Sequence, residues 1–114
     1  MNTITPKELS SLLTESPEKI ELIDVRGTEE YADVHIPNTK NIPLHLLPVR
    51  ITEVDTQKKV IMICRSGGRS SQACAFAEQN GLVTYNLIGG TTAYEVEFPN
   101  GVIRGEKKPF FKFF

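Results

Sequence analysis

Apolar runs along the chain predict three strands. The run Val60–Ile63 (VIMI) contains no polar residue and lies between Lys59 and a turn that holds two glycines. Such a run is typical of a strand that is buried on both faces, as in a parallel sheet. Ile20–Val25 (IELIDV) and Tyr85–Ile88 are further short stretches with strand character. We expect the strand at 60–63 to be the centre of the fold.

A first helix is predicted from Thr5 to about Glu15. Thr5 can cap its N-terminus, Pro6 suits the first helical position, and Glu8 completes a capping box. The apolar face of this helix is made by leucines at helical spacing: Leu9, Leu12 and Leu13.

A second helix is predicted from Ser70 to Asn80. Gly81 then takes the position just after the helix, where glycine is favoured. Ala73, Cys74 and Ala77 fall on one face, and we expect them to form a stripe that faces the core.

The segment that follows the predicted strand at 20–25 contains shorter predicted elements. Thr28 can cap a short acidic helix that runs through Tyr31. The residues before proline in Ile36-Pro37 and Ile42-Pro43 favour extended backbone, so we expect a connecting segment with one short strand.

Two further helical segments complete the pattern. Leu44–Val54 has the apolar positions of a loose helix, whose start is obscured by Pro48. Gly89-Gly90 predicts a turn, followed by a last short helix over Thr91–Phe98. Strands that alternate with helices in this way predict an α/β fold with a mostly parallel central sheet.

The length of 114 residues predicts a single domain over residues 1–114, because a chain of this size builds one hydrophobic core. Residues 104–114 are basic and aromatic without a usable period, and we treat them as a possible tail. We expect no membrane span, since no apolar stretch has the required length, and the N-terminus does not resemble a signal peptide.

Composition excludes several classes of function. A formal net charge of −1 gives no general attraction to nucleic acid, so we expect no nucleic-acid partner. Two cysteines without a disulfide-rich pattern fit a reducing compartment, and we expect a cytoplasmic protein. Neither the cysteines nor His35 and His45 have metal-ligand spacing, so the sequence predicts no metal site.

Cys64 carries the most specific chemical signal in the chain. It lies where the predicted central strand meets the turn Arg65-Ser66-Gly67-Gly68-Arg69-Ser70. In open α/β sheets, sites form beyond the carboxyl ends of the strands. Gly67 and Gly68 can take positive φ, which would let successive N–H groups and the N-terminus of the following helix point at the sulfur. With the charges of Arg65 and Arg69 nearby, this arrangement favours a thiolate and makes Cys64 a candidate nucleophile.

The two cysteines have different surroundings. For Cys64, the alternative is a purely structural thiol, but this does not explain a neighbourhood of two glycines and two arginines. For Cys74, a small core residue is the favoured interpretation because it lies on the inward stripe, and a resolving thiol for Cys64 is the alternative.

The sequence resembles the single-domain rhodanese family, the thiosulfate and persulfide sulfurtransferases, over nearly its whole length. The resemblance rests on Leu22-Ile23-Asp24-Val25-Arg26, Glu29-Glu30-Tyr31, His35-Ile36-Pro37, Asn41-Ile42-Pro43-Leu44, the loop Cys64–Ser70, and Gly89-Gly90 with Tyr94. It implies a rhodanese-like three-layer domain, in which helices flank the central sheet.

The resemblance also implies a reaction. Cys64 would accept a sulfane sulfur from thiosulfate or a persulfide donor, carry it as a covalent persulfide without any other cofactor, and pass it to a thiol, cyanide or a sulfur-relay protein. The amides from Arg65 to Ser70 would hold the persulfide, and Arg65 and Arg69 would attract an anionic donor.

Other polar residues near the predicted site have mainly structural interpretations. Asp24 is expected to form an ion pair with an arginine at the strand ends. The alternative role for Arg26 is direct contact with the substrate. By the family pattern, His35 is a hydrogen-bonded structural histidine. His45 is expected at the surface, and Tyr94 in the core or in a pocket wall.

Two other classes of function share this architecture. A cysteine-dependent phosphatase of the cell-cycle type, or a related arsenate reductase, holds an anion above a cysteine and has five residues between that cysteine and an arginine. Here four residues separate Cys64 from Arg69, so the loop better suits a single sulfur atom than a tetrahedral phosphoryl group. The third class is a non-catalytic rhodanese-like binding module, since a fold alone does not establish a reaction.

Overall fold

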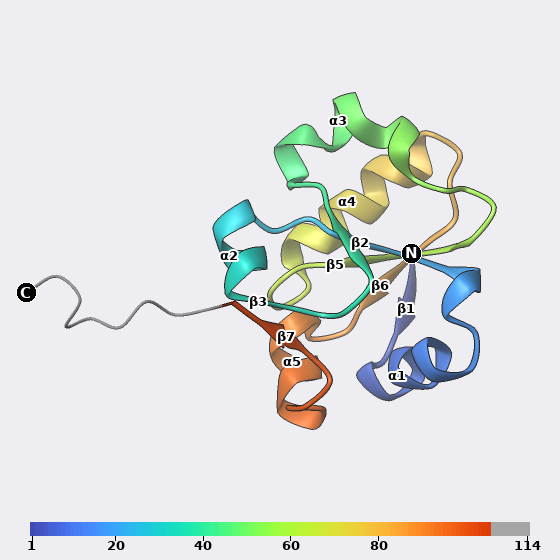
Figure 1. Cartoon of the computed structure of the whole chain (residues 1–114). Coiled ribbons are helices and arrows are strands. Elements are labelled where there is room, and N and C mark those ends of the chain that lie inside the picture. Colours follow the sequence, from blue (N-terminus) through green and yellow to red (C-terminus); the bar gives the residue numbers. More distant parts are fainter. Residues whose placement is uncertain (106–114) are drawn as a thin grey trace, which may run out of the picture.

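Five parallel strands form the central sheet in the computed structural model, which describes residues 1–105 (Figure 1). All four pairs of neighbouring strands run parallel, and β5 lies in the middle of the sheet. From one edge to the other the strands are β1 (Asn2–Ile4), β6 (Thr84–Leu87), β5 (Lys59–Ile63), β2 (Ile20–Asp24) and β4 (Thr39–Asn41). The predicted α/β class, with a mostly parallel sheet, is confirmed.

Helices cover both faces of this sheet, as Figure 1 shows. α1 (Pro6–Glu15) and α5 (Gly90–Glu97) pack on one face, while α3 (Leu47–Arg50) and α4 (Gly68–Gln79) pack on the other. α2 (Thr28–Asp33) follows the carboxyl end of β2. The predicted three-layer arrangement is therefore present.

The side chains of β5 explain why its sequence lacks a polar alternation. Val60 and Met62 belong to the core beneath α4, whereas Ile61 and Ile63 belong to the core beneath α1 and α5. All four are at most 2% exposed. Fully burying such a side chain contributes about 1.5–3 kcal/mol to the free energy of folding. Burial of both faces of the strand therefore stabilises its central position. The prediction of a strand buried on both faces is confirmed.

Both long helices follow their sequence signals closely. Thr5 caps α1 and forms a capping box with Glu8: the Thr5 hydroxyl accepts from the Glu8 N–H at 3.1 Å, and Glu8 accepts from the Thr5 N–H at 3.0 Å. In α4, Ala73, Cys74 and Ala77 are fully buried, which confirms the predicted inward stripe. Burial also raises the pKa of the Cys74 thiol.

Several predicted boundaries were wrong. α4 begins at Gly68 instead of Ser70, because Gly67 takes a left-handed conformation with φ of 114° and caps the helix. Gly67 has the expected positive φ, but Gly68 is an ordinary helical residue. Gly27 in place of Thr28 caps α2, with the side chain of Glu30 accepting from its N–H. β6 and α5 each begin one residue earlier than predicted.

The connections also differ from the prediction. The segment after α2 contains two strands, β3 (Val34–His35) and β4, where one was expected. The expected loose helix over 44–54 is divided into a 3₁₀ turn at Leu44–Leu46, α3, and a second 3₁₀ turn at Ile51–Glu53. A further 3₁₀ turn, Pro17–Lys19, follows α1.

Two short strands gave no clear signal in the sequence. β1 has three residues and a single buried one, Ile4, and β7 (Ile103–Arg104) has two exposed residues that pair antiparallel with β3. Arg104, which was assigned to the possible tail, thus belongs to the fold. Residues 106–114 of that tail lie outside the described residues. Among residues 1–105, no helix has the length and apolarity to cross a membrane.

Candidate active site

Cys64 lies directly after β5, where the chain turns into α4. Cys64 is 1% exposed, and its sulfur accepts two hydrogen bonds from the loop. The Gly67 N–H donates to Sγ at 3.0 Å, and the Ser70 hydroxyl lies 3.2 Å from Sγ. The loop that was predicted to surround the sulfur with donors does so.

These donors determine the ionisation of Cys64. Burial raises the pKa of its thiol. The Ser70 hydroxyl and the neighbouring N–H groups of Ser70, Gly67 and Ser66 outweigh burial and bring the pKa below the ordinary thiol value. Hydrogen bonds to the charged form of a group favour that form. Cys64 therefore has the electrostatic surroundings of a reactive cysteine and Cys74 does not.

Asn86 on β6 supports both donors and was not among the residues predicted from the sequence. It is 8% exposed, its Nδ2 donates to the Gly67 carbonyl at 3.1 Å, and its Oδ1 accepts from the Ser70 hydroxyl. That hydroxyl has one proton, so Asn86 and the Cys64 sulfur compete for it. The sequence signal that could have identified Asn86 is its polar side chain within a predicted strand whose other residues favour burial.

The N-terminal turn of α5 holds the start of the loop. The Thr91 N–H donates to the Cys64 carbonyl at 2.8 Å, and the Thr92 N–H donates to the Arg65 carbonyl at 3.1 Å. Gly90 has φ of 61°, and a Cβ atom there would overlap the backbone of Cys64 and Arg65. The glycine pair that was predicted as a turn therefore permits a helix to approach the Cys64 loop closely.

The two loop arginines have different surroundings. Arg69 forms a bidentate ion pair with Glu30 on α2, with Nη1–Oε1 and Nη2–Oε2 distances of 2.7 and 2.8 Å. The hydrogen bonds from Arg69 lower the pKa of Glu30 to about 2, so the pair is ionised throughout the neutral range. Arg65 is exposed and forms no ion pair with any residue from 1 to 105.

Asp24 and Arg26 form the expected ion pair at the end of β2. Arg26 Nη2 lies 2.8 Å from Asp24 Oδ2, and the two side chains are 3% and 0% exposed. Arg26 also donates to the Val34 carbonyl at 2.6 Å, which ties the end of β2 to β3. Asp24 is in register with Ile63, so the Asp24–Arg26 pair and Cys64 lie at the carboxyl ends of neighbouring strands, β2 and β5.

The other polar and aromatic residues have the predicted kinds of surroundings. The His35 ring stacks on Tyr31 at 4.0 Å between centroids, and its Nδ1 lies 2.8 Å from the Tyr31 carbonyl oxygen. His45 is exposed, and Tyr94 is 3% exposed within the core beneath α1 and α5.

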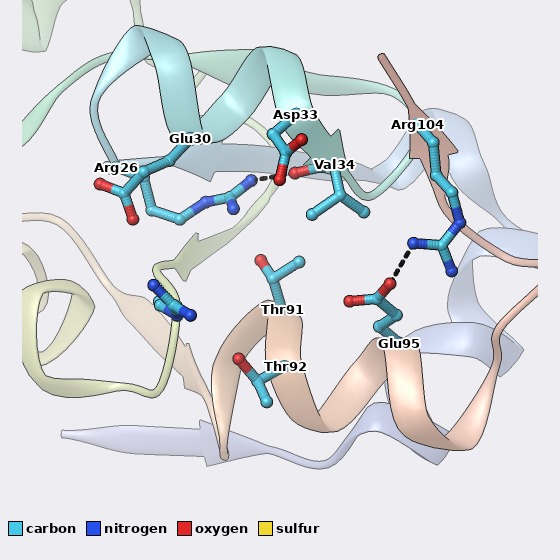
Figure 2. A pocket seen from close by; sticks show the side chains of 9 residues that line it. Arg26, Glu30, Asp33, Val34, Thr91, Thr92, Glu95 and Arg104 are labelled. Atoms are coloured by element: carbon cyan, nitrogen blue, oxygen red, sulfur yellow. Dashed lines mark hydrogen bonds and ion pairs between the residues drawn. The ribbon is translucent and has the colours of Figure 1, made fainter. Parts of the chain in front are cut away.

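A polar cavity of about 320 Å³ adjoins the loop through Arg65 (Figure 2). Figure 2 shows that its walls come from α2, β3, α5 and β7, with Thr91 directed from α5 toward the side formed by Arg26 and Val34. Val34 is the sole apolar residue among the described residues that line it. We call this space the Arg65 cavity.

Comparison with known proteins agrees with the sequence resemblance. The sequence model of the family described as rhodanese-like domain matches residues 5–97. A protein named sulfurtransferase from Allochromatium vinosum is 39% identical over 95 residues, which cover 82% of this chain and 88% of that protein. Thiosulfate sulfurtransferase GlpE from Pseudomonas syringae is 27% identical over 85 residues, covering 74% and 80%. A solved rhodanese-like domain protein from Staphylococcus aureus has a TM-score of 0.77 at 34% identity, covering 82% and 91%.

The contact between α5 and the loop predicts different effects for two glycine substitutions. Gly90→Ala should lower the free energy of unfolding by at least about 3 kcal/mol, because a left-handed alanine is strained and its methyl group overlaps the loop backbone. Gly81→Ala is the control: it has φ of 83° but open space around it, and should cost about 1–2 kcal/mol. Urea unfolding of both variants measures this, and equal losses would contradict the proposed contact.

The buried ion pair predicts a large effect of removing one charge. Asp24→Asn should lower the free energy of unfolding by about 3–5 kcal/mol, because Arg26 would remain charged and buried without its partner. Glu53→Gln, which removes the partner of Arg50 at the exposed surface, should leave thermal unfolding nearly unchanged. If Asp24→Asn unfolds like the wild-type protein, the pair does not fix this edge of the sheet.

Proposed function

Because this chain belongs to the family of rhodanese-like domains, we propose that it is a sulfurtransferase whose Cys64 carries sulfur as a persulfide. The observation that supports this most directly is the pair of donors on Cys64 Sγ, the Gly67 N–H and the Ser70 hydroxyl. Donors in this position stabilise negative charge on the sulfur that attacks and leaves.

Thiosulfate is the proposed donor, in line with the name of the Pseudomonas syringae relative. The Cys64 thiolate attacks the outer sulfur of thiosulfate and forms a new S–S bond. The S–S bond of thiosulfate breaks, and its electron pair leaves with sulfite. The loop donors lower the pKa of Cys64 from its ordinary value, which increases the fraction of attacking thiolate at neutral pH.

In the second half of the reaction, a thiolate or cyanide attacks the outer sulfur of the persulfide. The bond to Cys64 Sγ breaks, and its electron pair returns to Cys64 as a thiolate. A thiol of low pKa is the better leaving group in such an exchange. The same hydrogen bonds therefore assist both halves: they supply a thiolate to attack the donor, and they stabilise the thiolate that departs.

The surroundings of Arg69 disfavour the phosphatase and arsenate reductase alternatives. In addition to the short loop, the guanidinium of Arg69 is already bound at both nitrogens by the Glu30 carboxylate. An arginine in this state is less free to clamp a tetrahedral oxyanion on the cysteine. A single transferred sulfur atom carries no tetrahedral oxyanion and needs no such clamp, and the Gly67 N–H already reaches Cys64 Sγ.

Mass spectrometry after exposure to thiosulfate tests the proposed reaction. We expect a gain of about 32 Da, one sulfur atom, on the peptide that contains Cys64. Cys64→Ser should show no gain, while Cys74→Ala should keep it because Cys74 is a buried core residue whose thiol pKa is raised by burial. A folded wild-type protein that gains no sulfur from thiosulfate or from any persulfide donor would instead be a binding module.

A further inference from the structure

We propose that the Arg65 cavity binds a zwitterionic amino-acid thiol as the sulfur acceptor, with its carboxylate on Arg65 and its ammonium group on Asp33. The thiol would be cysteine or a small peptide that carries a cysteine. The chemistry of this step rests on the proposed sulfurtransferase function, whereas the binding of the ligand does not.

The charges of the cavity support this choice of ligand. Its lining contains three arginines and three carboxylates: Arg26, Arg65, Arg104, Glu30, Asp33 and Glu95. Four of these six charges already have an ion-pair partner. Arg26 is paired with Asp24, Glu30 with Arg69, and Arg104 with Glu95, as Figure 2 shows for the last pair.

Arg65 and Asp33 are the two charges that remain. Both are exposed, and neither forms an ion pair with the other or with any further residue in the described part of the chain, 1–105. A small ligand that carries one carboxylate and one ammonium group would compensate both through charge-assisted hydrogen bonds. A simple anion would compensate only Arg65 and would be repelled by Asp33.

The position of Arg65 links this cavity to the reacting sulfur. Arg65 follows Cys64 directly, and the first turn of α5 binds the carbonyls of both residues. Thr91 and Thr92 from that turn also line the cavity. The Thr91 hydroxyl is buried and has no hydrogen-bond partner among the described residues. A ligand at this wall would therefore lie beside the loop that carries the persulfide and next to a polar group without a partner.

The size of the cavity favours an organic ligand. Pockets for small organic molecules have volumes of about 300–1,000 Å³, and the Arg65 cavity of about 320 Å³ falls at the lower end of this range. Thiosulfate has only five heavy atoms and would leave most of this space unfilled. Thiosulfate can still react at the loop as the donor, while the cavity serves the acceptor.

The proposed transfer is a single displacement. The acceptor thiolate forms an S–S bond to the outer sulfur of the Cys64 persulfide, and the bond between that sulfur and Cys64 Sγ breaks with its electron pair on Cys64. The acceptor departs as an amino-acid persulfide. No external oxidant or reductant is needed, because one S–S bond replaces another.

A titration with an unreactive ligand tests the binding part of the proposal independently of sulfur transfer. The probe is S-methyl-L-cysteine, compared with 3-(methylthio)propionate, which lacks the ammonium group. In two-dimensional NMR spectra of the wild-type protein, we expect S-methyl-L-cysteine to shift the amide signals of Arg65, Thr91 and Thr92 and to bind more tightly than 3-(methylthio)propionate.

Asp33→Asn is the informative variant, and Glu29→Gln is its matched control, since Glu29 is an exposed carboxylate on the same helix but outside the cavity. Asp33→Asn should weaken S-methyl-L-cysteine binding by about threefold to fivefold, as expected for an exposed ion pair. It should not weaken 3-(methylthio)propionate binding, because Asp33 repels that anion. Equal losses for both ligands, an equal effect of Glu29→Gln, or no binding by the wild-type protein would overturn the proposal.

Discharge of the loaded protein tests the transfer itself. After sulfur loading from thiosulfate, the rate of loss of the Cys64 persulfide is measured with L-cysteine and with 2-mercaptoethanol. Asp33→Asn should slow discharge to L-cysteine by about threefold to fivefold and leave discharge to 2-mercaptoethanol unchanged. Failure of loading from thiosulfate and from persulfide donors, together with intact S-methyl-L-cysteine binding, would reject the sulfurtransferase function and retain the ligand site. Normal loading without selective binding of S-methyl-L-cysteine would reject the ligand site and retain the sulfurtransferase function.

Discussion

The site depends on one backbone contact, in which the first turn of α5 binds the carbonyl groups at the start of the Cys64 loop. The N–H groups of Thr91 and Thr92 donate hydrogen bonds to the carbonyl groups of Cys64 and Arg65, respectively. With these carbonyls held by α5, the following N–H groups can point toward the sulfur. The close approach requires the absence of a side chain at Gly90. The segment that was predicted as a last short helix therefore shapes the environment of Cys64.

The thiolate is stabilised chiefly by neutral donors. Burial alone would raise the pKa of Cys64, and the loop N–H groups with the Ser70 hydroxyl reverse that effect. Asn86 holds the same hydroxyl and the Gly67 carbonyl, so the donors are fixed from the neighbouring strand. A buried polar network of this kind gains strength when every member has a partner. The arrangement explains how a nearly inaccessible sulfur can still be ionised.

Much of the fold could be predicted from local sequence because its signals are local. The capping box at Thr5, the apolar run before Cys64 and the helical stripe through Cys74 each depend on neighbours along the chain, and the structure has all three. β1 and β7 could not be predicted in this way, because strands of three and two residues depend on pairing with β6 and β3 for their stability.

The site was predictable only in part, for the same reason. Cys64 and its loop are contiguous, so their chemistry was visible in the sequence. The partners of that loop come from distant elements: Glu30 from α2 binds Arg69, and Asn86 from β6 binds Ser70. The family resemblance implied that both loop arginines would attract an anionic donor, but the Glu30 contact gives Arg69 and Arg65 different surroundings. That difference became apparent only once α2 was placed beside the loop.

The most direct test of the central claim is a titration of the Cys64 thiolate by its ultraviolet absorbance, in a Cys74→Ala background so that one thiol reports. We predict a pKa below the ordinary thiol value, and a rise in this pKa when Ser70→Ala removes the hydroxyl donor. A Cys64 that titrates at or above the ordinary value, or one whose pKa does not respond to Ser70→Ala, would contradict a thiolate held by the loop donors.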